Sequence, residues 1–480
     1  MKKKIVILGA GLAGLSIARE LLKRRDFNAD IEIIEREPYV GGLSASFVSE
    51  RIILDFGSHR LHPSAPKNVF DDISALLGKQ LIKRPRKGRI FLDGRFISFP
   101  VKLLDASLHL PLKFISGTIK DSIYAIFKRP RNDSVSYEEE VERRFGTTFC
   151  ESFYFPYARK LWGIEPKEIS MEQASRRVSA GNPVYILLRA ICLAFQRQSG
   201  NAGSFYYPVR GFGQIAEKFA GDIIISGGKL RLSNSVCEIQ SNGNSGFCII
   251  VRRNHAQQDE EKNDEIPADF VFSTIPVNNL VQMINPPAPY NVIKASENLK
   301  YRAMLFVYLI LKAKQITPYD AHYFPNADVI FSRVSEPKNY SGTTEPDDMT
   351  GLCAEIPCNT NDKIWNAQDN EIINKVISDL EHIGFSIKSH LKTAFIRRRT
   401  NVYPVYNLNF RKNLDVINNY LDELHGIVSL GRQGLFLHNN IHNSINAGYK
   451  ANECLESGLR WNSQKWHASR KEITEEVVLD

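Results

Sequence analysis

The first sixteen residues, MKKKIVILGAGLAGLS, constrain the fold of this chain more than any other stretch. An apolar run from Ile5 to Leu8 leads into three glycines, and the apolar residues then recur at helical spacing. This order predicts a strand, a tight turn and a helix. Gly9 allows the turn, Gly11 allows a pyrophosphate to approach the backbone, and Gly14 allows the helix to pack closely on the strand. The amide groups and the dipole of the helix N-terminus would face the phosphates.

A glycine pattern of this kind is weak by itself, so its context decides. A second apolar stretch, Ile31 to Ile34, is followed by Glu35, whose carboxylate would accept hydrogen bonds from a ribose hydroxyl. A secretion signal starting at Lys2 fits less well, because the glycines interrupt its apolar core and no clear cleavage site follows. An ordinary structural turn is disfavoured because strand, helix, strand and acid occur in register. We therefore predict a dinucleotide-binding site.

Composition places the chain among ordinary globular proteins. It has 480 residues, of which 43% are hydrophobic and 24% charged, enough for more than one domain. The chain has seven scattered cysteines and no CxxC pair, which indicates a reducing, cytoplasmic compartment. We predict no metal site. No apolar run is long enough to span a membrane. The net charge of +9 is compatible with anionic ligands, but the basic residues form no recognisable nucleic-acid-binding module.

Several local patterns predict secondary structure. Residues 89–99 read as a hairpin that turns through Asp93-Gly94, and residues 137–198 read as mostly helical with Ser136 as a cap. Within that region, the apolar stretch 183–198 fits a partly buried helix better than one on a membrane surface, although peripheral membrane contact stays open. The polar residues after Trp466 predict a flexible tail.

Motifs along nearly the entire chain resemble the two-domain FAD flavoproteins that include protoporphyrinogen oxidase, the amine oxidases and UDP-galactopyranose mutase. Besides the first motif and Glu35, they are Gly41-Gly42, YPVRGFGQI, the strand around Val236, FSTIP and the late pair Gly431-Arg432. The resemblance implies that FAD is the cofactor. It would contact Gly9, Gly11, Leu12, Ala13, Gly14, Glu35, Arg36, Gly42, Leu43, His59, Val236, Gly431, Arg432, Asn440 and Ser444.

The substrate half is most similar to the mutases. YARKLWG resembles an element that would put Tyr157 against a nucleotide base and Trp162 near the sugar and flavin. HYFPNADVIFSRVSEPKNYS resembles a strand pair in which Tyr323 and Arg333 face the pyrophosphate. SRRVSA offers Arg177 as a flap arginine.

Three further positions complete the resemblance on the substrate side. Tyr403-Pro404 matches a YP element, Arg432 would contact the phosphates of the nucleotide sugar, and His59 would lie beside the reduced flavin. The chain departs from the mutases at His438, where they carry a tyrosine, and at His442, where an acid is common. We keep His438 as a candidate substrate contact.

The physical chemistry supports an anionic substrate. Planar guanidinium groups match phosphate oxygens two at a time, and tyrosine hydroxyls can fill the remaining acceptor sites. Separate segments supply such groups at Arg177, Arg333, Arg432, Tyr323 and Tyr403. Each has an ordinary structural explanation by itself, and only their occurrence together favours a site. We regard His59, Arg177, Arg333 and Arg432 as the candidate catalytic residues.

We therefore predict an α/β fold with a discontinuous Rossmann-type FAD-binding domain. It comprises residues 1–66, 200–295 and 400–465. A substrate domain with a helical part and a β-sheet part comprises residues 67–199 and 296–399, and residues 466–480 form the tail. The flavin would lie at the interface, where ligands commonly bind.

The predicted activity is that of a flavin-dependent enzyme, a nucleotide-sugar pyranose/furanose mutase. As the resemblance implies, it would act through reduced FAD and a flavin–sugar adduct in surface glycan synthesis, with NAD(P)H only as an external reductant. The alternative is an FAD-dependent oxidase or dehydrogenase of the protoporphyrinogen or amine oxidase kind. A remote third possibility is a structural flavin in a non-enzymatic docking protein. The nucleotide, the sugar and the oligomeric state stay open.

Overall fold

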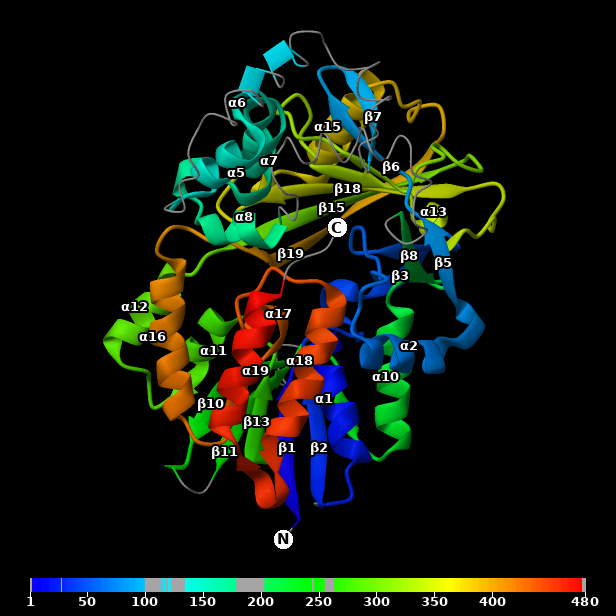
Figure 1. Cartoon of the computed structure of the whole chain (residues 1–480). Coiled ribbons are helices and arrows are strands. Elements are labelled where there is room, and N and C mark those ends of the chain that lie inside the picture. The colour runs from blue at the N-terminus through cyan, green and yellow to red at the C-terminus, as the bar shows by residue number, and fades with distance from the viewer. Residues whose placement is uncertain are drawn as a thin grey trace.

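The structure, a computed structural model, describes residues 2–26, 28–99, 114, 116–117, 120–121, 134–177, 203–243, 246–254 and 263–476. They form a mixed α/β fold with two stacked bodies (Figure 1). One body holds a parallel sheet flanked by helices, with the N-terminus at its far end, and the other holds a larger, mostly antiparallel sheet. Both bodies are assembled from segments that lie far apart in the sequence.

A five-stranded parallel sheet forms the centre of the first body. In spatial order, its strands are β20 (Ile427–Ser429), β13 (Phe270–Ser273), β1 (Lys3–Leu8), β2 (Ala29–Ile34) and β9 (Lys229–Arg231). The last four residues of β1 and all of β13 are buried. Helices on both faces explain why these strands read as continuous apolar runs instead of alternating patterns.

Helices cover the two faces of this sheet in two groups. Ile5 and Ile7 face α1 (Leu12–Lys23), α2 (Lys67–Leu77), α10 (Gln214–Ile225), α18 (Ile441–Cys454) and α19 (Ser463–Glu475). Val6 and Leu8 face α11 (Val277–Met283), α12 (Tyr290–Asn298) and α16 (Phe410–Glu423). This alternation follows from the two-residue period of a strand.

A four-stranded sheet packs its apolar side into the same core as α11, α12 and α16. Its strands are β12 (Asp264–Ala268), β11 (Phe247–Arg253), β10 (Asn234–Ser241) and β14 (Ile284–Asn285). β10 begins at the edge of the first body's sheet, so Val236 is placed near the end of β2.

The second body is built on a seven-stranded sheet. In spatial order, its strands are β19 (Leu391–Pro404), β15 (Tyr301–Leu311), β18 (Thr350–Cys358), β17 (Arg333–Ser335), β16 (Ala321–Tyr323), β6 (Gly88–Leu92) and β7 (Arg95–Phe99). One face packs on α15 (Asp369–His382). The other face packs on the hairpin of β3 (Ser46–Ser49) and β4 (Ile52–Asp55), which joins the two bodies.

A layer of helices lies beside this sheet: α5 (Tyr137–Phe145), α6 (Thr147–Phe149), α7 (Phe155–Trp162) and α8 (Met171–Arg177). The remaining elements are short: β5 (Leu81–Pro85) paired with β8 (Ser204–Pro208), β21 (Leu455–Glu456) paired with β22 (Arg460–Trp461), α13 (Pro337–Ser341), α14 (Lys363–Asn366) and α17 (Gly431–Gly434). None of the helices in the described part of the chain combines the length and the apolar character needed to span a bilayer.

Two local predictions are confirmed. β6 and β7 form the hairpin, and its turn uses positive φ angles at Asp93 (50°) and Gly94 (76°). Ser136 caps α5, and its side chain and that of Glu139 exchange hydrogen bonds with each other's backbone amides. The predicted helix at 183–198 lies outside the described residues.

The prediction of a flexible tail is wrong for the described residues after Trp466. α19 continues to Glu475, and the side chains of Trp466 and Ile473 are buried against α18 and its neighbours. Two apolar residues seven positions apart are enough to hold one face of a helix when a core is available. The domain boundaries stay a prediction, although α2 packs against α10 and α18 and thus favours a first boundary later than residue 66.

Candidate cofactor and substrate cavity

A cavity of about 470 Å³ lies where the two bodies meet. It opens at the carboxyl ends of β1, β2 and β13, the edge at which parallel sheets commonly bind ligands. Seventeen predicted site residues line it: Gly9, Gly11, Leu12, Ala13, Glu35, Arg36, Gly42, Leu43, His59, Val236, Tyr323, Arg333, Tyr403, Arg432, His438, Asn440 and Ser444. The fold therefore brings most of the candidate residues to one place.

Each of the three glycines in the turn lacks a side chain for a different geometric reason. Gly9 has a φ of 101°, and a Cβ there would lie 2.5 Å from Oγ1 of Thr274. A Cβ on Gly14 would lie 2.0 Å from the carbonyl oxygen of Gly9, so the helix and the turn meet without room for a side chain. A Cβ on Gly11 would meet nothing within 4 Å, because this position faces the cavity. The backbone there is open to a close-lying ligand.

Glu35 is a buried carboxylate at the end of β2. One of its oxygens accepts the backbone N–H of Ala10 (2.7 Å) and the other accepts that of Glu37 (2.9 Å). Burial raises the pKa of Glu35, and these hydrogen bonds oppose the rise. Because a carboxylate offers about four acceptor sites, two remain for ligand hydroxyls.

The late segment supports the opposite wall of the cavity. Gly431 has a φ of 77°, and a Cβ there would lie 2.6 Å from the Cβ of Ala13. Arg432 donates hydrogen bonds to the carbonyl oxygens of Asn439 (2.7 Å) and Val402 (3.2 Å). Its guanidinium group therefore joins two backbone segments of the wall. The sequence analysis predicted a phosphate contact for Arg432 but not this structural role.

His59 is buried beside the cavity. Its Nε2 lies 2.9 Å from the carbonyl oxygen of Phe56, to which it donates a hydrogen bond. Burial, reinforced by the positive charge of Arg333, lowers the pKa of His59 to about 4. The imidazole is therefore neutral near pH 7 in the protein alone, and it would act on a ligand through polarity instead of positive charge.

Arg333 forms a forked ion pair with Glu355, a residue that the sequence analysis missed. Nε and one terminal nitrogen of Arg333 donate to the two carboxylate oxygens at 2.7 and 2.6 Å. The same carboxylate accepts the backbone N–H of Ser58 (3.1 Å). Glu355 lies in the apolar strand sequence TGLCAEIPC, and an acid inside such a strand is a signal that could have found it.

Two further missed arginines lie around Tyr323. Arg60 donates to the Tyr323 hydroxyl at 3.4 Å and pairs with Asp320 at 3.2 Å. Arg86 lies over the ring of Phe99, 4.6 Å from its centre, and that ring packs against the ring of Tyr323 at 5.1 Å. Both arginines line the cavity. Arg60 follows His59 directly, so the histidine motif itself marked the position.

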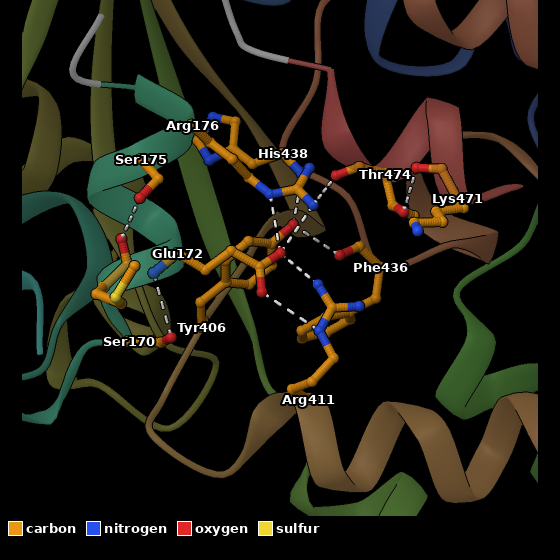
Figure 2. Close-up of polar contacts among 11 residues, drawn as sticks. Ser170, Glu172, Ser175, Arg176, Tyr406, Arg411, Phe436, His438, Lys471 and Thr474 are labelled. Carbon is orange, nitrogen blue, oxygen red and sulfur yellow. Dashed lines mark hydrogen bonds and ion pairs between the residues drawn. The ribbon is translucent and has the colours of Figure 1, made fainter. Parts of the chain in front are cut away.

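The wall formed by Tyr403 and His438 is held from behind. The rings of these two residues stack at 4.9 Å. As Figure 2 shows, the backbone N–H of His438 donates to the hydroxyl of Tyr406 (3.1 Å), which donates to the carbonyl oxygen of Phe436 (3.0 Å). The amide of Gln173 on α8 reaches Nδ1 of His438 at 3.4 Å.

A charged network fixes α8 beside this wall (Figure 2). The carboxylate of Glu172 accepts hydrogen bonds from Arg176 (2.8 and 3.0 Å) and from Arg411 of α16. Arg176 also donates to the carbonyl oxygen of Thr474, and its guanidinium lies 5.7 Å from the ring of Tyr406. The C-terminal helix α19 thus takes part in positioning the cavity wall.

Two predicted substrate residues, Trp162 and Tyr157, lie outside the described lining of the cavity. Trp162 is buried within the helical layer, where its ring packs against Tyr137 at 5.3 Å. Tyr157 is half-buried and stacks on Phe153 at 5.8 Å. Among the described residues that line the cavity, neither of these two occurs. Arg177 is the last residue of α8, and its side chain lies outside the described part of the structure.

Comparison with known proteins identifies the family. The model of the flavin-containing amine oxidoreductases matches residues 12–461. The chain belongs to this family. It is therefore an FAD-dependent enzyme, in agreement with the glycine turn and the acid at the end of β2.

Within this superfamily, the chain is similar to several mutases and oxidases. It is 26% identical to the dTDP-fucopyranose mutase of Escherichia coli over 171 residues, which are 35% of this chain and 43% of the relative. It is 20% identical to protoporphyrinogen oxidase 2 of Arabidopsis thaliana over 508 residues, covering 95% and 94% of the two chains. The structure of reduced UDP-galactopyranose mutase superposes with a TM-score of 0.81 at 20% identity, covering 100% and 98%. The matched stretch thus spans less than half of the first mutase, and the structural likeness shows the fold alone.

The cavity of this family member fits FAD. The open position at Gly11 and the N-terminus of α1 suit a pyrophosphate, and Glu35 retains acceptor sites for ribose hydroxyls. Leu43 and Asn440 line the same cavity. These individual contacts remain proposals.

Proposed function

We propose that this enzyme is a flavin-dependent mutase that interconverts the pyranose and furanose forms of a nucleotide sugar. Reduced FAD would supply the bond chemistry at the anomeric carbon, with NAD(P)H as the external reductant. Covalent catalysis and a role in surface glycan synthesis belong to the same proposal, which the similarity to mutases supports.

One observation carries the proposal: the cavity holds an unpaired positive charge near Tyr323. Arg60 is paired with Asp320, and Arg333 is paired with Glu355. Among the described residues, Arg86 has no hydrogen-bond acceptor or carboxylate partner for its guanidinium group, and its Nε is buried. Arg86 is half-buried, and a partly desolvated guanidinium group without a partner favours a ligand that brings negative charge. A diphosphate matches this requirement.

The residues of the chain then divide the work. Arg86 and Arg60 would bind the diphosphate beside Tyr323, and the stacked pair of Tyr403 and His438 would exclude water from the reacting sugar. His59, neutral near pH 7, would contact the flavin side of the site. These groups place and surround the substrate, and no side-chain nucleophile is needed.

Arg86→Ala tests this assignment. We expect it to weaken the binding of UDP, dTDP or GDP to the FAD-loaded enzyme by about tenfold, because a charge-assisted hydrogen bond contributes about 1.5 kcal/mol or more. Titration of the flavin spectrum measures this change. Lys83→Ala is the matched control, because it removes the same charge from β5 at an exposed position outside the cavity lining.

Two results would count against the assignment of Arg86 to the diphosphate. Unchanged nucleotide binding in Arg86→Ala would show that Arg86 does not bind the diphosphate and would contradict the proposal. Loss of FAD from that variant would place Arg86 on the cofactor side of the cavity instead.

An oxidase of the protoporphyrinogen oxidase kind is the second candidate. The likeness to the Arabidopsis oxidase covers nearly the whole of both chains, whereas the likeness to the E. coli mutase covers less than half of either. The carboxylates of a porphyrinogen could also satisfy Arg86. Steady oxygen consumption with a porphyrinogen or an amine, without any response to nucleotides, would favour this alternative.

A further inference from the structure

A half-buried lysine connects the helical layer to the strands that carry Tyr323 and Arg333. Lys160 lies on α7, and its Nζ donates hydrogen bonds to four backbone oxygens of the segment 324–331. The acceptors are the carbonyl oxygens of Phe324 (3.0 Å), Val329 (2.9 Å), Phe331 (3.1 Å) and, at shorter range, Asn326. One ammonium group thus holds both ends and the middle of the segment.

The segment 324–331 joins β16 to β17. Tyr323 is the last residue of β16 and Arg333 is the first residue of β17, and the two are direct partners in the antiparallel register. Both side chains line the cavity, whereas none of the four residues whose carbonyl oxygens Lys160 binds is among the described residues of the cavity lining. Any loosening of the segment 324–331 would therefore shift both Tyr323 and Arg333.

The hydrogen bonds of Lys160 are strengthened by the positive charge of the donor. Three N–H groups serve four carbonyl oxygens, so the ammonium group has no unused donor. Desolvation lowers the pKa of Lys160 to about 8, against the opposing influence of Asp328 and Asp379. Asp379 is itself paired with Lys375 at 2.6 Å.

We propose that Lys160 is a positioning residue for the substrate side of the cavity. By holding the segment 324–331, it sets the relative placement of Tyr323 and Arg333 and so controls the affinity for the group that binds there. That this group is a diphosphate rests on the proposed function, but the control of the strand pair by Lys160 does not.

The chain contains a matched control for this arrangement. Lys338 on α13 also donates to four backbone oxygens from one buried ammonium group. Its acceptors are Lys314 (3.1 Å), Thr344 (3.3 Å), Pro346 (2.6 Å) and Met349 (3.0 Å). Among the described residues that line the cavity, neither Lys338 nor any of these acceptors occurs. Removal of either ammonium group should cost a comparable set of hydrogen bonds.

The experiment compares FAD-loaded wild type, Lys160→Met and Lys338→Met. Amide hydrogen exchange measured by mass spectrometry reports the segment 324–331, and titration with UDP reports the cavity. We expect Lys160→Met to exchange about tenfold faster in this segment and to bind UDP about tenfold more weakly, with unchanged FAD content. Lys338→Met should alter exchange near residues 344–349 and leave UDP affinity within about twofold of wild type.

Either of two outcomes overturns the inference: wild-type exchange of the segment 324–331 in Lys160→Met, or an equal loss of UDP affinity in the two variants. If the wild type binds no nucleoside diphosphate, the proposed function fails, and the exchange comparison still decides the role of Lys160.

Should Lys160→Met not fold, the pH dependence of the wild type replaces it. Raising the pH from 7 to 9.5 removes the ammonium proton, so exchange in the segment, corrected for its intrinsic pH dependence, should accelerate in wild type. It should not accelerate in Lys160→Arg, whose charge persists. Identical pH profiles for these two proteins would also overturn the inference.

Discussion

At the scale of single residues, the buried pair of Arg333 and Glu355 is the most consequential contact of the site. The carboxylate is only 3% exposed, so its charge depends on the guanidinium group beside it. Arg333→Ala would leave that charge unpaired, and we expect a loss of about 3 to 5 kcal/mol in the free energy of unfolding. Adding Glu355→Gln to this variant should restore a large part of the loss, because the buried charge is then gone. Denaturant unfolding of the apoprotein measures both values.

If Arg333→Ala were as stable as wild type, or if the double variant were less stable than the single one, the pair would not have the importance assigned to it.

The same contact shows how far the site could be predicted from the sequence. The glycine turn and Glu35 were found because their geometry depends on neighbours along the chain. Glu355 and Arg333 meet through the register of β17 on β18, and no local pattern encodes that register.

At the scale of secondary-structure elements, Asp55 at the end of β4 joins three segments of the first body. Its carboxylate accepts hydrogen bonds from Ser46 of β3 (2.5 Å), from Tyr207 of β8, and from the backbone N–H of Phe212 (3.2 Å). Burial raises the pKa of Asp55 from its usual 3.8 to about 6. The folded state therefore binds a proton more tightly than the unfolded state between these two pH values.

Stability should consequently fall as the pH rises through this window and become level above pH 6. The contribution of Asp55 to this fall is about 3 kcal/mol, at 1.36 kcal/mol for each pKa unit. Asp55→Asn should lack it, so the difference in melting temperature between wild type and variant should change between pH 4 and pH 7. A constant difference would show that Asp55 does not titrate in this range.

Elements were predictable where the pattern is long or the turn is specific. The strand that ends at Leu8, the Asp93-Gly94 hairpin and the Ser136 cap are examples. α19 was missed because only Trp466 and Ile473 anchor it, and a polar helix with two apolar contacts is indistinguishable from a tail until its core is known. Trp162 was assigned to the cavity, but α7 turns this side chain into the helical layer.

At the scale of the whole molecule, the two bodies enclose one continuous cavity with distinct halves. The first body provides the glycine turn, Glu35 and the helix N-termini, which suit a dinucleotide. The second body provides Tyr323 and Arg333 from strands held by Lys160. The family indicates the FAD cofactor, and the proposed anionic substrate would meet it at the interface of the two bodies.

The most direct test of the central claim is product analysis with the reduced holoenzyme. The purified protein is reduced with dithionite under anaerobic conditions, incubated with UDP-, dTDP- and GDP-sugars in turn, and the sugars are examined by NMR for ring isomers. We predict that at least one nucleotide sugar is converted between its pyranose and furanose forms, and that oxidation of the flavin abolishes the conversion. Absence of any ring isomer, together with steady oxygen consumption on a porphyrinogen or an amine, would contradict the account.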